Sequence, residues 1–413
     1  MEREPLNVLL LSNTDPVPFV QGADRDWVNL LNAIGPEHLR VTWVGLGGTA
    51  RLRDSIDRRV LVRTVDIEEQ PCLYEVVPDN AHAQRSHWLW AKIIGASTLD
   101  LARSYRRLRR ALGREPIDLV VTNTVVVLLG AFFARLTGRP HVWNIKEHLD
   151  PRVDACRRFA RLVNRYSSAV VVPSKIIGEA FGPGALVLPD GGDLERIRVS
   201  VKTGREEVLR SLGLPSNLPL VAQAGAITQR KGQHLTAEAF VRLAREGGPP
   251  TFSLAFFGQG DSETLERLDA TLSQAPPEWR AVVRFSSFGS DDLSPLGAAD
   301  VLVHPSVFHD AFPNAVREAM TLGKPVIASA MGGMTDMIVD GENGLLVRPG
   351  DAEALASAIE RLVGGAGERR RLGEAARAFA EQNFDIHVRK LAYLDLMTRL
   401  ARPAAGVSGR RAA

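Results

Sequence analysis

The chain has 413 residues, and its 45% hydrophobic and 24% charged content excludes a collagen, a coiled-coil rod and a mainly disordered protein. At roughly 150 residues per domain, this length predicts two or three domains with cores that need no disulfide support. The formal net charge of +3 is too small to indicate nucleic-acid binding.

Cysteine usage and apolar run length indicate a compartment. Cys72 and Cys156 lie far apart and offer neither a disulfide framework nor a CxxC metal site, which favours the reducing cytosol. The apolar run at residues 8–11 is too short for a signal peptide. The longest apolar run, residues 125–134, is about half as long as the roughly 20 residues of a membrane span. We therefore expect a cytoplasmic protein.

Short apolar runs alternate with helical patterns in the first half of the chain. The predicted strands span residues 7–11, 41–44, 119–122, 141–145 and 169–172. The predicted helices span residues 23–34, 88–112, 125–136 and 151–166. Such alternation predicts a mostly parallel α/β sheet.

A second alternating series follows residue 193, after the breaker-rich hinge sequence Pro189-Asp190-Gly191-Gly192-Asp193. Its predicted strands span residues 218–224, 252–257, 282–285, 301–304, 325–328 and 345–347. Its predicted helices span residues 233–246, 263–273, 314–322 and 352–363, and a last helix spans residues 386–400. We therefore predict two Rossmann-like domains of similar size and a disordered tail at residues 403–413.

Ligands of open α/β sheets bind beyond the carboxyl ends of the strands, so the loops there are candidate sites. The first such loop places Gly22 at a helix start, where backbone N–H groups can approach an anion. A tight strand-to-helix turn is the alternative reading. Asp24 and Asp26 form a DxD pair, but residues two apart on a helix do not share a face, so we expect no metal site.

Basic residues stand out in the second loop, where Arg230 and Lys231 precede Gly232 at a predicted helix start. Two cations beside a glycine at a helix start can form a phosphate-binding loop. A solvent-exposed basic turn is the alternative reading of the same residues. The fourth loop opens a helix with Gly332 and Gly333 and either lines a nucleotide pocket or simply connects two elements.

Two carboxylates flank a helix N-terminus in the third loop. Asp310 precedes the helix, Pro313 suits its first turn, and Glu318 follows. The helix end can hold a phosphate, and the carboxylates can accept protons from sugar hydroxyls. A charge favoured by the helix dipole is the alternative reading of Glu318.

The order and spacing of these motifs resembles the family-4 retaining glycosyltransferases of the two-domain GT-B fold. The matching pieces are Gly225…Arg230-Lys231-Gly232, Phe257-Gly258-Gln259-Gly260, Ala299-Asp300-Val301, Pro305-Ser306, Asp310-x7-Glu318, Gly323-Lys324-Pro325-Val326, Gly332-Gly333 and residues 341–347. The first half matches more loosely. The resemblance implies two Rossmann-like domains that face a central cleft. Residues 1–192, with a last helix at about 385–402 that crosses back, would form the acceptor domain, and residues 193–384 the nucleotide-sugar domain.

The resemblance implies transfer of a sugar, with retention, from a nucleotide-diphosphate sugar to a hydroxyl acceptor, without a metal or other cofactor. The acceptor would be a glycan, a lipid-linked sugar or a small molecule. The donor-site residues that the resemblance implies are Gly22, Arg230, Lys231, Gly258, Gly260, Phe312, Pro313, Asn314 and Glu318. Arg230 and Lys231 would hold the diphosphate, and Glu318 the ribose. The glycines would let the base and phosphates approach the backbone.

Three residues are candidates for the reacting end of the donor: Asp310, His148 and Glu147. By the resemblance, Asp310 would hold the sugar hydroxyls. His148 follows Glu147 in a loop where such enzymes often have a polar residue that faces the donor sugar, and a structural histidine is the alternative. In this family the leaving phosphate is thought to take the acceptor's proton, so no general base is obligatory.

This sequence departs from the family pattern at Ala226, Asp310 and Asp336, where the family usually has Arg, Glu and Glu. Loss of the arginine removes a bidentate phosphate clamp, for which Arg230 is the candidate substitute. These departures leave open a non-catalytic paralogue, and the shared GT-B fold leaves open a sugar-nucleotide epimerase.

Residues 88–114 predict a basic amphipathic helix with interfacial tryptophans, which can lie on an anionic membrane. That reading predicts a peripheral protein at the inner face of the plasma membrane, with a lipid-linked acceptor. A core-packed helix with a solvated basic face is the alternative.

Overall fold

The computed structural model describes residues 4–13, 22–45, 55–67, 87–125, 127–287, 289 and 291–402, with the backbone alone at residues 22–23 and 87–99. Cys72 and the expected tail at residues 403–413 lie outside these residues. The chain divides into two compact units. One is Met1–Gly191 together with Ile386–Ala413, and the other is Gly192–Asp385.

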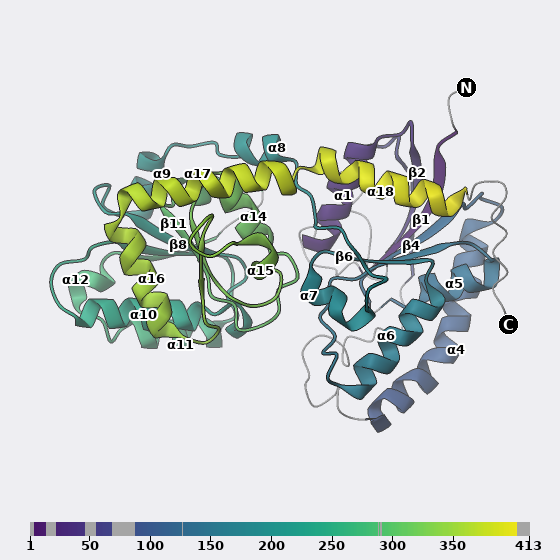
Figure 1. The fold of residues 1–413 in the computed structure, drawn as a ribbon, viewed down its shortest axis with the longest axis horizontal. Coiled ribbons are helices and arrows are strands. Elements are labelled where there is room, and N and C mark those ends of the chain that lie inside the picture. The colour runs from purple at the N-terminus through teal and green to yellow at the C-terminus, as the bar shows by residue number, and fades with distance from the viewer. Residues whose placement is uncertain are drawn as a thin grey trace. The chain divides into compact units, whose positions relative to one another are not determined.

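The first unit is built on a parallel sheet that has seven strands within the described residues, in the order β3-β2-β1-β4-β5-β6-β7 (Figure 1). Its strands are β1 (Leu6–Ser12), β2 (Leu39–Gly45), β3 (Leu61–Asp66), β4 (Leu119–Asn123), β5 (His141–Asn144), β6 (Ala169–Val172) and β7 (Leu186–Val187). The strand order reverses between β1 and β4, and ligands of doubly wound sheets bind beyond the strand ends at such a switch point.

Helices cover both faces of this sheet. They are α1 (Gly22–Ile34), α4 (His87–Leu112), α5 (Leu129–Thr137), α6 (Asp154–Tyr166), α7 (Lys175–Gly178), the 3-10 helix η2 (Glu179–Phe181) and α18 (Ile386–Ala401). The last helix, α18, lies beside α1 (Figure 1), and the rings of Trp27 and Tyr393 meet edge to face at 5.8 Å. The expectation that the last helix returns to the first unit is confirmed.

The second unit repeats the design, with a parallel sheet in the order β10-β9-β8-β11-β12-β13. Its strands are β8 (Leu220–Ala224), β9 (Ser253–Phe257), β10 (Val283–Ser286), β11 (Val301–His304), β12 (Val326–Ser329) and β13 (Leu345–Val347). Its longer helices are α9 (Arg205–Leu212), α10 (Gln233–Arg245), α11 (Ser262–Leu272), α14 (Asn314–Thr321), α16 (Ala352–Gly364) and α17 (Ala366–Asn383). Its short helices are α8 (Leu194–Val199), η3 (Gln229–Lys231), α12 (Pro277–Arg280), α13 (Ser294–Ala298) and α15 (Met334–Met337).

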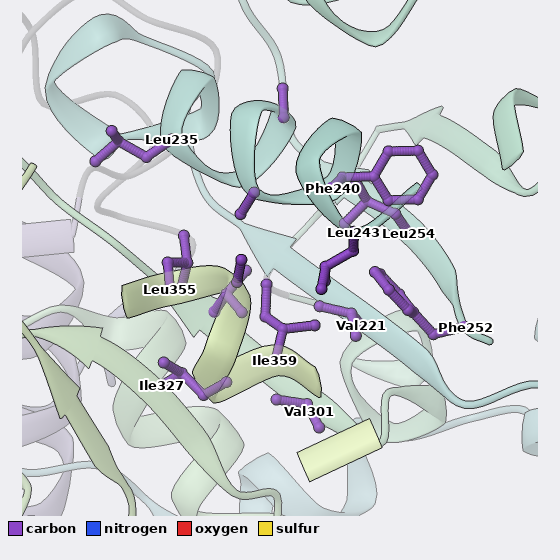
Figure 2. Close-up of a cluster of buried hydrophobic side chains, with 14 of the residues drawn as sticks. Val221, Leu235, Phe240, Leu243, Phe252, Leu254, Val301, Ile327, Leu355 and Ile359 are labelled. Atoms are coloured by element: carbon purple, nitrogen blue, oxygen red, sulfur yellow. The ribbon is translucent and has the colours of Figure 1, made fainter. Parts of the chain in front are cut away.

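One core of the second unit lies between its sheet and the pair α10 and α16 (Figure 2). The strand residues Val221 and Val301 and the helix residues Phe240 and Ile359 are fully or almost fully buried there. Burial of strands under helices on both faces explains why the strands read as continuous apolar runs rather than alternating ones. Burying each such side chain contributes roughly 1.5–3 kcal/mol, which makes the sheet a rigid base for the loops at its edge.

Several elements differ from the expectations, and four of them are instructive. Strand β3 was not expected, because charged side chains interrupt its apolar pattern, and β7 was not expected because it has only two residues. Helix α17 was also missed: it is rich in arginine and alanine, and few of its residues are buried. The helix expected at residues 125–136 starts only at Leu129, because Val125 donates its N–H to the Glu147 carboxylate instead of starting a helical turn.

Candidate functional site

Glycines join the loops that follow β9 and β8 at the carboxyl edge of the second sheet. A Cβ on Gly258 would lie 1.9 Å from the carbonyl oxygen of Gly225, and one on Gly260 would lie 2.9 Å from the Ile227 carbonyl. Ile227 also donates its N–H to the Gln259 carbonyl at 2.7 Å. Loop packing alone therefore requires both predicted glycines, independently of any base that lies against them.

Glycines also join the loop after β11 to the loops on either side of it, which follow β8 and β12. A Cβ on Gly232 would lie 1.9 Å from the Pro305 carbonyl oxygen, and Gly232 has a φ of +73°, which favours glycine. Gly332 and Gly333 pack against the backbone of the Asp310 loop, and the Gly333 N–H donates to the Asp310 carbonyl at 2.7 Å. The four loops thus form one continuous edge in the order of their strands.

Lys231 and Asp310 meet at the point where the strand order reverses between β8 and β11. The Lys231 Nζ donates to both carboxylate oxygens of Asp310, at 2.9 and 2.6 Å. His304, the buried last residue of β11, places its Nε2 2.9 Å from Asp310 Oδ2. His304 was not among the predicted site residues, although a histidine that ends a buried apolar strand is itself a signal.

These two partners determine the ionisation of Asp310. Burial alone would raise its pKa, but the hydrogen bond from His304 and the charge of Lys231 outweigh burial and hold the pKa of Asp310 well below its usual range. Asp310 is therefore a fixed anion at neutral pH that accepts hydrogen bonds.

Arg230 lies beside this pair with its guanidinium 4.1 Å from the centre of the Phe308 ring. Its backbone carbonyl accepts hydrogen bonds from the Val307 N–H and the Ser306 hydroxyl, both at 3.0 Å. The loop that carries both predicted phosphate-binding cations is thus fastened to the loop that carries Asp310.

The N-terminus of α14 follows Asp310. Pro313 precedes Asn314, the first helical residue, and Phe312 is buried against Phe384 at 5.1 Å between ring centres. Within the described part of the chain, the buried Oδ1 of Asn314 has no hydrogen-bond partner. Glu318 is the fifth residue of the helix and is 5% exposed.

A second polar group lies at the carboxyl edge of the first sheet and contains the predicted residues Glu147 and His148, both half-buried. Glu147 Oε1 accepts a hydrogen bond from the Thr124 hydroxyl, and Oε2 accepts hydrogen bonds from the backbone N–H groups of Val125 and Lys146, at 3.0 and 3.1 Å. Both oxygens of the Glu147 carboxylate therefore accept hydrogen bonds from residues of the first unit.

Three buried aspartates and one lysine complete this group, for which no common role was predicted from the sequence. Lys146 Nζ donates to Asp26 at 3.0 Å and to Asp190 at 2.9 Å. Burial works to lower the pKa of Lys146, but the two carboxylates outweigh it and hold that pKa above its usual range. Asp24 is different: burial raises its pKa from 3.8 to about 6, although hydrogen bonds with Ser12 and Asn123 work the other way.

Two further predicted features lie at the border of what the structure describes. Gly22 is the first residue of α1, and the loop of residues 14–21 before it is outside the described residues. The segment 88–114 lies mostly within α4, whose described apolar positions Leu101, Leu108 and Leu112 are buried within the unit. Within the described residues, no helix is long and apolar enough to cross a bilayer.

Solved structures share this fold along nearly the whole chain. HepE of Anabaena, solved in complex with UDP, superposes with a TM-score of 0.75 at 20% identity, over 96% of this chain and all of HepE. Another HepE structure contains UDP-glucose. The two parallel sheets, each with a strand-order reversal, define a GT-B protein.

Part of the chain matches a family model. Residues 204–379 match the model described as glycosyl transferases group 1. The lipopolysaccharide core biosynthesis glycosyltransferase LpsE of Rhizobium meliloti is 33% identical over 45% of this chain and 52% of its own length. A GDP-mannose-dependent phosphatidylinositol monomannoside mannosyltransferase of Mycolicibacterium smegmatis is 27% identical over 74% of this chain and 80% of its own. The chain thus spans about half the length of LpsE.

Proposed function

We propose that this chain is a retaining glycosyltransferase that moves a sugar from a nucleotide-diphosphate sugar to a hydroxyl acceptor without a metal ion. The observation that carries the proposal is the contact between Lys231 and Asp310 at the switch point of the second sheet, inside the region that matches the family model. A cation and a fixed anion side by side suit a donor that presents a diphosphate next to sugar hydroxyls.

When the donor binds, the Lys231 ammonium group would exchange Asp310 for the diphosphate as its partner. A diphosphate oxygen is a stronger partner for the ammonium group than a carboxylate that already has a second donor, and Asp310 keeps His304 after the exchange. Arg230 would add a second cation in place of the arginine that Ala226 replaces. Fixed cations of this kind stabilise the charge that develops on the leaving group.

Asp310 and the start of α14 would hold the donor sugar. Once Lys231 turns to the phosphates, the ionised Asp310 accepts hydrogen bonds from hydroxyls. The buried Oδ1 of Asn314 is a further acceptor that the described chain leaves without a donor. The N–H groups of the first turn of α14, which have no partners within the helix, would be further donors, and Glu318 would bind the ribose hydroxyls.

Two of the relatives favour a lipid-linked acceptor, whereas others are named for the small molecules D-inositol 3-phosphate and 2-deoxystreptamine. The names of LpsE and of the mannosyltransferase both specify lipid-borne glycans. The exposed arginines of α4, Arg106, Arg107 and Arg110, would contact anionic lipid by charge alone, because the described apolar stripe of that helix is buried. Replacing the three by glutamate should abolish binding to anionic liposomes. Unchanged binding would contradict membrane contact through α4.

The first test is a thermal-shift panel of UDP-, GDP-, ADP- and dTDP-sugars, with and without EDTA. We expect one donor to raise the melting temperature equally in both conditions. Lys231→Ala and Glu318→Ala should abolish that shift, while Arg242→Ala, which removes an exposed ion pair with Glu353, should keep it. A folded protein that responds to none of the donors would contradict the proposal.

Turnover of the responding donor separates the alternatives. Transfer to an acceptor with the anomeric configuration kept supports the proposal. An epimer formed from the donor alone would identify an epimerase instead. Loss of the shift in EDTA would overturn metal independence.

A further inference from the structure

Thr124 has a backbone conformation that its side chain opposes. It follows β4 directly, and it is the single non-glycine residue with a positive φ, +88°, among those the structure describes. A β-branched residue in this region is an outlier, because its Cβ crowds the neighbouring carbonyl. Such strain persists where the surroundings over-determine it, and it is concentrated at functional sites.

Hydrogen bonds with three residues, Asn144, Trp143 and Glu147, hold Thr124 in place. Its N–H donates to the Asn144 carbonyl at 2.8 Å, and its carbonyl accepts the indole N–H of Trp143 at 2.9 Å. Its hydroxyl donates to Glu147, and the next residue, Val125, donates its N–H to the same carboxylate at 3.0 Å. The neighbours in β5 hold the start of the turn, and Glu147 contacts both the Thr124 side chain and the residue that follows it.

The same carboxylate shapes its own loop. Glu147 Oε2 accepts the Lys146 N–H at 3.1 Å, so one oxygen joins the turn after β4 to the turn after β5. The Lys146 side chain is anchored independently by Asp26 and Asp190. His148 is the next residue along the chain. The path of the backbone into His148 is therefore set by the contacts of Glu147 and Lys146.

We propose that Glu147 is a positioning residue that holds Thr124 in its left-handed conformation and thereby fixes the His148 loop, and that it takes no part in proton transfer. Both carboxylate oxygens are used within the first unit, by a hydroxyl and two N–H groups. A glutamine can make the same contacts, because its carbonyl oxygen accepts the N–H groups and its amide can donate to the threonine hydroxyl. A glutamate that acted as a base or nucleophile could not be replaced in this way.

The test is a double-mutant cycle between positions 124 and 147, read by melting temperature and by kcat/KM. Glycine adopts a φ of +88° without strain. In Thr124→Gly, the backbone therefore no longer needs the clamp, by which we mean the contacts of Glu147 with residues 124 and 125, to keep this conformation. We expect Glu147→Ala to lower the melting temperature by about 4 °C or more and kcat/KM about 10- to 100-fold. In the Thr124→Gly background, the same change should cost less than about a third as much on either scale. Glu147→Gln should stay within about threefold of the parent in kcat/KM.

Thr137→Gly, at the end of α5, is the matched control for the flexibility that a glycine adds. In that background, Glu147→Ala should keep its full effect. Equal loss of activity in Glu147→Gln and Glu147→Ala at unchanged melting temperature would overturn the proposal and assign Glu147 to the chemistry. Additive effects in the Thr124→Gly cycle would also overturn it. The activity readout rests on the proposed function, whereas the melting-temperature cycle does not, so a parent without transferase activity leaves the clamp testable.

Discussion

The carboxyl edges of the two sheets have the same topology but opposite electrostatics. In the second unit, one partly buried carboxylate, Asp310, has a lysine and a histidine as donors, and its pKa falls. In the first unit, burial raises the pKa of Asp24 to about 6, because the hydrogen bonds with Ser12 and Asn123 do not outweigh it and the nearby Lys146 is already paired with Asp26 and Asp190. Burial pushes both pKa values upward, and the partners decide the outcome.

The two edges also achieve close loop packing differently. The second uses glycines whose missing side chains let backbones touch, as at Gly258 and Gly232. The first uses Thr124 in a glycine-like conformation, held by hydrogen bonds. The glycines of the second edge allow this packing without further support. Thr124 at the first edge depends on hydrogen bonds to keep its strained conformation. The four changes below test this contrast.

The largest effect is expected from Lys231→Ala. It leaves Asp310 with His304 alone, so the free energy of unfolding should fall by about 1–3 kcal/mol and the pKa of Asp310 should rise. Loss of the phosphate-binding cation should lower kcat/KM by about 100-fold or more. Urea unfolding and donor kinetics measure the two effects. Arg242→Ala, which breaks an exposed pair of the same unit, should change the free energy of unfolding by less than about 1 kcal/mol.

Asp24→Asn should stabilise the protein in a pH-dependent way. Between pH 4 and pH 6 the folded state keeps the Asp24 proton that the unfolded state has lost, so the stability due to this group declines as the pH rises. Above pH 6 the ionised Asp24 lowers the free energy of unfolding by about 3 kcal/mol relative to acidic pH. An asparagine does not ionise and therefore avoids this loss. Urea midpoints should therefore rise at pH 7.5 and match the parent near pH 3.5. The exposed Asp395→Asn is the control, and an equal gain at both pH values would refute the explanation.

Gly258→Ala should cost about 2 kcal/mol, because the new Cβ would lie 1.9 Å from a backbone carbonyl that cannot move freely. Gly367→Ala, in α17 with open space around its Cβ, should instead stabilise the protein by about 0.5–1 kcal/mol. Chemical denaturation of both variants is the measurement. A neutral Gly258→Ala would show that the loops after β8 and β9 are not packed as described.

Tyr393→Phe should have the smallest effect, about 1 kcal/mol or less. The buried Tyr393 hydroxyl donates to Asn144 Oδ1 at 3.3 Å, and Asn144 in turn donates to Asn123. The phenylalanine keeps the ring contact with Trp27, so only the hydrogen bond is lost. Thermal unfolding beside Tyr166→Phe, on an exposed tyrosine, measures the difference. A loss of several kcal/mol would show that this network stabilises the first unit more than its single bond suggests.

Local patterns were enough to predict most of the fold. Buried strands such as β11 and β13 were predicted at their observed bounds, because continuous apolar runs between turn residues are typical of them. Helix α17 was missed because alanine and arginine give little apolar periodicity.

The site was only partly accessible from the sequence. The glycine loops and the Asp310 motif were found, but not the contact between Lys231 and Asp310, which are 79 positions apart. Nor does a threonine in the sequence predict a left-handed backbone, because the contacts that hold Thr124 come from β5 and from Glu147 in the loop after it. Roles in sugar transfer remain predictions for these residues.

The two helices that cover one face of the first sheet, α1 and α18, are separated by about 350 residues, and the whole second unit is encoded between them. At 5–20 residues per second, a ribosome needs roughly 20–70 s to reach α18 after it has completed α1. The second unit, a continuous segment, can therefore fold while the first still lacks its last helix. The unit that is synthesised first is the one that is completed last, and α1 residues such as Trp27 must wait for their partner throughout that interval.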